Sequence, residues 1–154
     1  MSEYLRELLL TYKGCGISFK TVGNFNISGT VIDISGMCVE IKSHHNYYYI
    51  TPLCNIMFIK PFDNGERSQR FLEQVKCEHL SESGLSDYAI ELGIRAGRLL
   101  AVNEIRDIWI NCVDGENYIE DIIDVIPGLI FAKDTIFVTS HVVSLGFKSN
   151  DNNE

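Results

Sequence analysis

The pattern of apolar and polar positions predicts a short helix followed by several short strands. Leu5, Leu8, Leu9 and Tyr12 recur every three or four residues, which is typical of a helix with one apolar face. Gly14 marks its end. From residue 17 onward, apolar and polar side chains alternate instead, as they do in half-buried strands. We expect strands at residues 17–22, 25–34, 38–42, 47–51 and 56–59, with turns at residues 23–24 and 35–36.

The second half of the chain follows the same order. Residues 86–93 (Ser-Asp-Tyr-Ala-Ile-Glu-Leu-Gly) resemble residues 2–9 (Ser-Glu-Tyr-Leu-Arg-Glu-Leu-Leu), and a helix is expected between the halves at residues 68–80. Further strands are predicted at residues 105–113, 118–126, 129–133, 135–139 and 142–147.

Individual residues also recur at a nearly constant spacing. The spacing is 91 residues for Val22/Val113, Asp33/Asp124 and Lys42/Lys133, and it falls to 88 for Thr51/Thr139 and Lys60/Lys148. An internal repeat constrains the architecture more strongly than local propensity does. We therefore interpret the chain as a duplicated unit of one helix and one small sheet.

Each set of five strands favours a small closed barrel, because closure removes the exposed edges of a sheet. Gly29 falls in the middle of a predicted strand, where a glycine permits the sharp bend that a small barrel needs.

Residues 17–60 resemble the Sm-like small β-barrel family. The similar features are the turn at Gly23, the Gly29-x-Val31 pattern of the bent strand, and Tyr49-Ile50 followed by Asn55-Ile56. This stretch is also similar to small spore-coat-associated barrel proteins of Gram-positive bacteria. The resemblance implies a fold that is mainly β with short α-helices, in which two Sm-like or SH3-like barrel units are joined by a helical connector. The expected divisions are residues 1–62, 63–85 for the connector, 86–148, and a disordered tail at 149–154.

The chain departs from this family at the positions that the resemblance would assign to RNA binding. RNA-binding members carry Asp and Asn after the bent strand, where this chain has Ser35 and Val39. They carry Arg-Gly in a later loop, where it has residues 51–53 (Thr-Pro-Leu) and, in the second half, Ser140-His141. Arginine and asparagine would stack on a base and read its edge. The resemblance therefore implies the fold and not the uridine site.

Composition and charge narrow the classes of function. The net charge is −8, and residues 105–154 carry −6 of it. The second half therefore repels a phosphate backbone, and we expect no binding to duplex DNA. The five cysteines show no disulfide framework, which favours a cytoplasmic protein with reduced, mostly buried thiols. No secretion signal or membrane-spanning run is present, so we expect no membrane contact.

One polar face of the first half is the candidate ligand site. Histidines and tyrosines adjoin in the segment from His44 to Tyr49, and such side chains suit stacking on a nucleotide or gripping a partner. The alternative interpretation, solvated loop residues beside an ordinary strand, stays open. The candidate ligand-binding residues are Lys20, Asn24, Lys42, His44, His45, Tyr47 and Tyr48.

Catalytic and metal-binding patterns are not evident in the sequence. It has no Gly-x-Ser-x-Gly motif, phosphate-binding glycine loop or Cys-x-x-Cys pair, so we expect no enzyme activity, cofactor or metal. The first hypothesis is a non-enzymatic interaction protein that forms homo-oligomers through barrel edges. The alternative is a regulator that sequesters a nucleotide or a short RNA on the first barrel.

Overall fold

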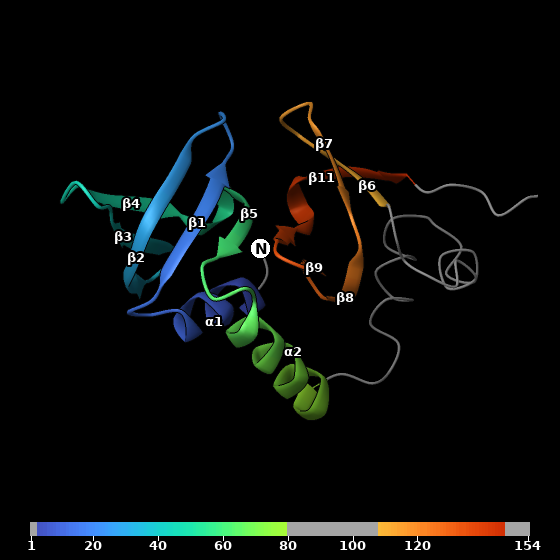
Figure 1. Cartoon of the computed structure of the whole chain (residues 1–154), viewed down its shortest axis with the longest axis horizontal. Helices are drawn as coiled ribbons and strands as arrows, with labels where there is room; N and C mark the ends of the chain where they lie inside the picture. The colour runs from blue at the N-terminus through green and yellow to red at the C-terminus, as the bar shows by residue number, and fades with distance from the viewer. Residues whose placement is uncertain (1–2, 80–107, 147–154) are drawn as a thin grey trace, which may run out of the picture.

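The computed structural model describes residues 3–79 and 108–146, which form two helices and two antiparallel sheets (Figure 1). The first half contains α1 (Glu3–Thr11), β1 (Gly16–Thr21), β2 (Asn26–Ser35), β3 (Cys38–Lys42), β4 (Tyr48–Pro52), the 3-10 turn η1 (Leu53–Asn55), β5 (Ile56–Pro61) and α2 (Glu66–His79). The second contains β6 (Ile108–Cys112), β7 (Asn117–Glu120), β8 (Ile122–Ile126), β9 (Leu129–Ala132), β10 (Ile136–Val138), the 3-10 turn η2 (Thr139–His141) and β11 (Val142–Gly146).

The predicted strands are confirmed to within a few residues, and the fold is mainly β. The exception is the strand expected at residues 118–126, which is divided at Asp121 into β7 and β8, on different sheets. The turn at residues 23–24 is also confirmed, with φ of 84° at Gly23 and 68° at Asn24. The helix predicted from residue 86 and the tail at 149–154 lie outside the described residues.

Both sheets are open, so the predicted closed barrels are not found. One sheet has the strand order β4-β3-β2-β1-β5-β10-β9-β8, and the other has the order β11-β6-β7. The physical reason lies at β5: its free edge pairs with β10 of the second half instead of returning to β4 of its own half. The strands of the two halves therefore continue one another in a single sheet.

The two halves pair their strands in the same order. Ile17 lies opposite Gly29 in β1 and β2, and Ile108 lies opposite Glu120 in β6 and β7, both 91 residues later. From β4 onward the spacing is 86, since η2 (139–141) follows η1 (53–55) at that distance, and not the 88 expected from the sequence. Phe19 opposite Ile59 thus corresponds to Ile110 opposite Leu145.

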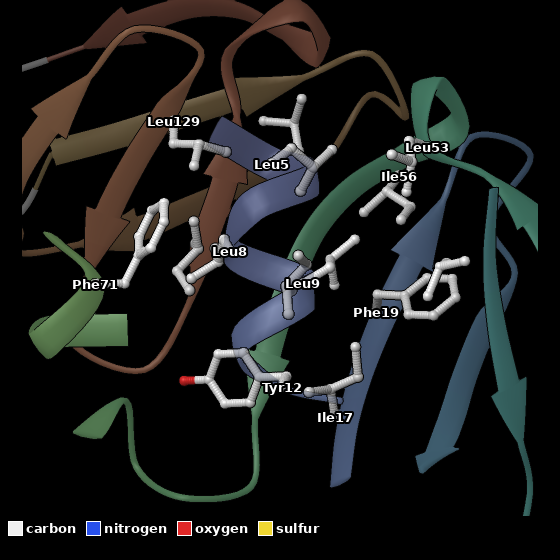
Figure 2. Packing of buried hydrophobic residues seen from close by; sticks show 14 of the residues in the cluster. Leu5, Leu8, Leu9, Tyr12, Ile17, Phe19, Leu53, Ile56, Phe71 and Leu129 are labelled. Atoms are coloured by element: carbon white, nitrogen blue, oxygen red, sulfur yellow. The ribbon is translucent and has the colours of Figure 1, made fainter. Parts of the chain in front are cut away.

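The larger hydrophobic core joins both halves under the helices. Leu5, Leu8 and Leu9 of α1 are fully buried. Figure 2 shows α1 with Phe71 and Leu129 on one side, and with Phe19 and Ile56 of the first half on the other. A helix with one apolar stripe is stable only when that stripe is covered, and here both halves cover it.

Hydrogen bonds of Tyr12 connect α1 to the start of α2. Its hydroxyl lies 2.5 Å from the hydroxyl of Ser68, accepts the Ser68 backbone N–H and donates to Asp63. Asp63 in turn accepts the backbone N–H groups of Gly65, just before α2, and of Arg67 in its first turn. An N–H group that has no partner within the helix is thereby satisfied. Burial raises the pKa of Tyr12 to about 12, so this hydroxyl stays protonated.

A second core lies between β5, β8–β10 and the smaller sheet. Most of its members from the second half correspond to core residues of the first half 91 positions earlier, as Ile110 corresponds to Phe19 and Val125 to Ile34. Cys112 and Phe137 correspond instead to the buried threonines Thr21 and Thr51. Met57 and Phe58 of β5 complete it. Each half therefore contributes apolar side chains to the core of the other.

The thiols differ from the sequence expectation. Cys112 alone is buried, and burial raises its pKa to about 11. Cys15 and Cys38 are half-buried, whereas Cys54 in η1 and Cys77 on α2 are exposed. The prediction of mostly buried thiols is wrong. At Cys54 the reason is η1, which directs Leu53 into the core and leaves its neighbour outside.

Gly29 is where β2 passes closest to the end of β3. A Cβ atom at this position would lie 2.2 Å from the backbone oxygen of Lys42. We predict that Gly29→Ala lowers the free energy of unfolding by about 1–3 kcal/mol, because the backbone must move to relieve the overlap. Urea denaturation measures the loss, and Thr30→Ala at the exposed next position is the control. Equal midpoints for the two variants would contradict this explanation of the glycine.

Candidate functional site

The joint between the halves is the antiparallel pair β5·β10. Ile136 lies opposite Ile59, and Phe137 lies opposite Phe58. The two isoleucines belong to the helix-covered core, whereas the two phenylalanines belong to the second core, with ring centroids 5.6 Å apart. Tyr118 completes this aromatic group, 5.1 Å from Phe58 in an edge-on arrangement. The joint is thus buried on both faces.

An ion pair crosses the joint beside the aromatic group. The Nζ atom of Lys20 lies 2.8 Å from Oδ2 of Asp114 and donates a second hydrogen bond, of 3.1 Å, to the hydroxyl of Tyr118. That hydroxyl donates to the same carboxylate oxygen at 2.8 Å. The other carboxylate oxygen accepts the backbone N–H of Glu116, which fixes the turn after β6. Only 1% of the Asp114 side chain is exposed.

The pKa values of the pair agree with this geometry. Burial alone would raise the pKa of Asp114, but the hydrogen bonds from Lys20, Glu116 and Tyr118 outweigh it, and the pKa lies below its ordinary value. The hydrogen bonds to Asp114 and Tyr118 raise the pKa of Lys20. Both groups are therefore charged around neutral pH, and each is neutralised by the other.

The structure divides the seven predicted ligand residues into three places. Lys42, His44, His45, Tyr47 and Tyr48 lie together at the β3–β4 hairpin, where the Lys42 ammonium sits 5.7 Å from the centre of the Tyr48 ring. Asn24 belongs to the separate β1–β2 turn. Lys20 points into the joint toward Asp114 and is not part of an open anion site.

Sequence reasoning does not identify which strands form the edges of the sheets. The outer strands are β4 and β8 in the large sheet and β11 and β7 in the small one. β7 and β8 each contain an acidic residue, Glu120 and Asp124. The outer edges of β4 and β11 are unpaired within residues 3–79 and 108–146. β4 exposes three apolar side chains, those of Tyr48, Tyr49 and Ile50, and β11 exposes Val143. Neither strand contains a charged residue. The available signal is the unbroken apolar run from Tyr47 to Ile50, which does not alternate with polar residues as a strand with one buried face does.

Other features of the described residues offer little for chemistry. No three of their His, Cys, Asp or Glu side chains are placed to hold a metal ion, and none of their helices is long and apolar enough to cross a membrane. A hollow between the start of α2 and the β9–β10 turn has a volume of about 40 Å³. Small-molecule sites usually enclose about 300–1,000 Å³, so a nucleotide would not fit there.

Comparison of the chain with protein-family models, with curated proteins and with solved structures finds no match. The function is therefore argued from the geometry.

The ion pair predicts a pH-dependent contribution to stability. We expect Asp114→Asn to lower the free energy of unfolding at pH 7 by about 1.5–3 kcal/mol, because it removes a charge-assisted hydrogen bond while leaving an oxygen for the turn. A carboxyl group whose pKa is lowered by folding stabilises the protein above its unfolded value, near pH 4. That stability is lost as the pH falls through the folded value, so the difference between variant and wild type should shrink below pH 4.

Chemical denaturation at pH 3 and pH 7 checks this expectation. Glu116→Gln, an exposed change on the same turn, is the matched control and should differ little from wild type at either pH. An equal loss for Asp114→Asn at both pH values would show that the charge of Asp114 does not stabilise the joint.

Proposed function

We propose that this protein is a non-enzymatic interaction protein whose copies associate through the edges of their sheets. The observation that carries the proposal is β4, an outer strand whose side chains of Tyr48, Tyr49 and Ile50 are all exposed. An exposed apolar strand edge readily pairs with another chain, because its peptide groups are unpaired and its side chains gain from being covered.

The two edges lack the features with which proteins usually prevent such pairing. Natural edge strands carry charged side chains, internal prolines or a covering element. The sequence of β4 is Tyr-Tyr-Ile-Thr-Pro, with its proline at the last position, and that of β11 is Val-Val-Ser-Leu-Gly. The absence of charge within both strands supports association as their role.

The buried polar groups support a structural rather than a catalytic role. Lys20, Asp114 and Tyr118 satisfy one another across the joint, and burial holds the pKa of the Cys112 thiol well above neutral pH. A thiol with a raised pKa is a weak nucleophile.

We also propose that the two halves arose by duplication of one unit. What supports this is the matching order of strand pairs, at spacings of 91 and then 86 residues. The likeness to Sm-like proteins stays a proposal, limited to the local motifs of residues 17–60 because the sheets are open.

The alternative function is capture of a nucleotide or a short RNA at the β3–β4 hairpin. One observation favours it: the Lys42 ammonium lies over the Tyr48 ring, beside two histidines of the same loop. A ligand that binds the folded state raises its melting temperature by mass action. We expect nucleotides and oligouridine to leave the melting temperature unchanged; a shift that Lys42→Ala abolishes would favour the alternative instead.

Self-association is tested by light scattering after size exclusion. We expect wild-type protein at micromolar concentrations to exceed the mass of one chain, and Ile50→Lys to return it to one chain, because a lysine on an edge strand opposes pairing. Phe25→Lys is the matched control, since Phe25 is 67% exposed and Ile50 is 71% exposed. Phe25 lies in the turn between β1 and β2 and belongs to neither edge strand. A monomeric wild type, or equal loss in both variants, would overturn the proposal.

A further inference from the structure

Two residues that are buried at the joint, Ile136 and Met57, have exposed counterparts in β4 and β11. Ile136 of β10 is 2% exposed, and its counterpart in β4, 86 positions earlier, is Ile50, which is 71% exposed. Met57 of β5 is fully buried, and its counterpart in β11, 86 positions later, is Val143, which is 65% exposed. All four residues are apolar. The same kind of surface is therefore covered at the joint and exposed on β4 and β11.

Met57 and Val143 also share an unusual backbone position. The register of β1·β5 shifts so that Lys20 lies opposite Phe58 and Thr21 opposite Ile56, which leaves Met57 without a direct partner. The register of β6·β11 shifts in the same way around Val143, between Val142 and Ser144. Such bulges turn a side chain out of the normal alternation. In β5 the bulge directs Met57 into the core of the other half.

The peptide groups of Ile50 point outward from the sheet. The Tyr47 carbonyl and the Leu53 N–H both bond to the β3 side, to Ser43 and Met37. Peptide groups alternate in direction along a strand, so those of Ile50 face away from β3. Leu145 faces away from β6 by the same alternation, since its counterpart Ile59 faces β10. β4 at Ile50 and β11 at Leu145 therefore each present an outward N–H donor and an outward carbonyl acceptor.

We propose that β4 of one copy pairs antiparallel with β11 of the next, with Ile50 opposite Leu145 and Thr51 opposite Ser144. This inference rests on the proposed self-association and specifies its partner surfaces. This register is copied from the pairing of β10 with β5. Each β10 residue is replaced by its counterpart in β4, 86 positions earlier, and each β5 residue by its counterpart in β11, 86 positions later. Because the two edges are different surfaces, the contact is head-to-tail, and each added copy leaves one edge of each kind free until a ring closes.

The contact between copies is weaker than the joint within a chain. At the joint Phe58 packs against Phe137, whereas the corresponding positions between copies are Ser144 and Thr51. A Ser–Thr pair across strands buries less apolar surface than two aromatic rings. Assembly is therefore reversible and depends on protein concentration.

Mixing two edge variants of the full chain tests the head-to-tail contact. Ile50→Lys damages β4 and keeps β11, and Val143→Lys damages β11 and keeps β4. Light scattering should find one chain in each variant alone and two chains in an equimolar mixture, because one intact edge of each kind remains. Circular dichroism confirms that both variants fold. Phe25→Lys alone is the matched control, and it should associate like wild type because it keeps both edges.

The outcomes separate this inference from the proposed function. If Val143→Lys associates like wild type while Ile50→Lys does not, self-association stands and the role of β11 is overturned. A mixture that stays at one chain also overturns the head-to-tail contact. If wild type itself is a monomer, the proposed function fails.

A disulfide test checks the register and detects weak contacts too. Ile50→Cys is mixed with Leu145→Cys in a background where the exposed Cys54 and Cys77 are serine, and the mixture is oxidised. Opposed residues in an antiparallel pair lie within the distance that a disulfide spans. We expect a covalent dimer in the mixture and little in either variant alone. Equal cross-linking in Ile50→Cys alone would show that β4 pairs with β4, and no dimer in any sample would overturn the register.

Discussion

The pairing of β5 with β10 is the constraint on which the rest of the structure depends. It places Ile59 beside Ile136 on one face of the sheet and Phe58 beside Phe137 on the other, so that both cores cross the boundary between the halves. A unit of about 60 residues buries little apolar surface by itself. By sharing an edge, each half covers surface that the other would otherwise expose to water.

The same pairing determines which surfaces remain uncovered. An edge of each half is used at the joint. Among the outer strands that remain in the part of the chain that the structure describes, β4 and β11 are the two without a charged residue. The ion pair between Lys20 and Asp114 and the contact of His141 with the Cys54 carbonyl, at 2.6 Å, have no role at those ends. They belong to the joint, where they connect one half to the other.

Local pattern was sufficient for the strands but not for their arrangement. The bounds of Cys38–Lys42 follow directly from alternation and the adjoining turns, because a hairpin is determined by neighbouring residues. The choice of β10 as the partner of β5 is a contact between segments about 80 residues apart, and no local signal distinguishes it from closure onto β4. Lys20 was assigned to a ligand site for the same reason, since its partner Asp114 lies 94 residues away in the sequence. The hairpin residues from Lys42 to Tyr48 stay together because they are consecutive, whereas Ile50 resembles a core residue in sequence and is exposed in the structure.

In the proposed assembly, the outward peptide groups of β4 and β11 bond to each other between copies. Amide hydrogen exchange observes those groups directly. The exchange rates of the Ile50 and Leu145 amides should be measured at two protein concentrations, below and above the onset of self-association. The Thr51 amide, which faces β3, serves as the internal reference. We expect the Ile50 and Leu145 amides to become protected only at the higher concentration and the Thr51 amide to be protected at both. Equal exchange of Ile50 at both concentrations, in samples whose mass shows assembly, would contradict it.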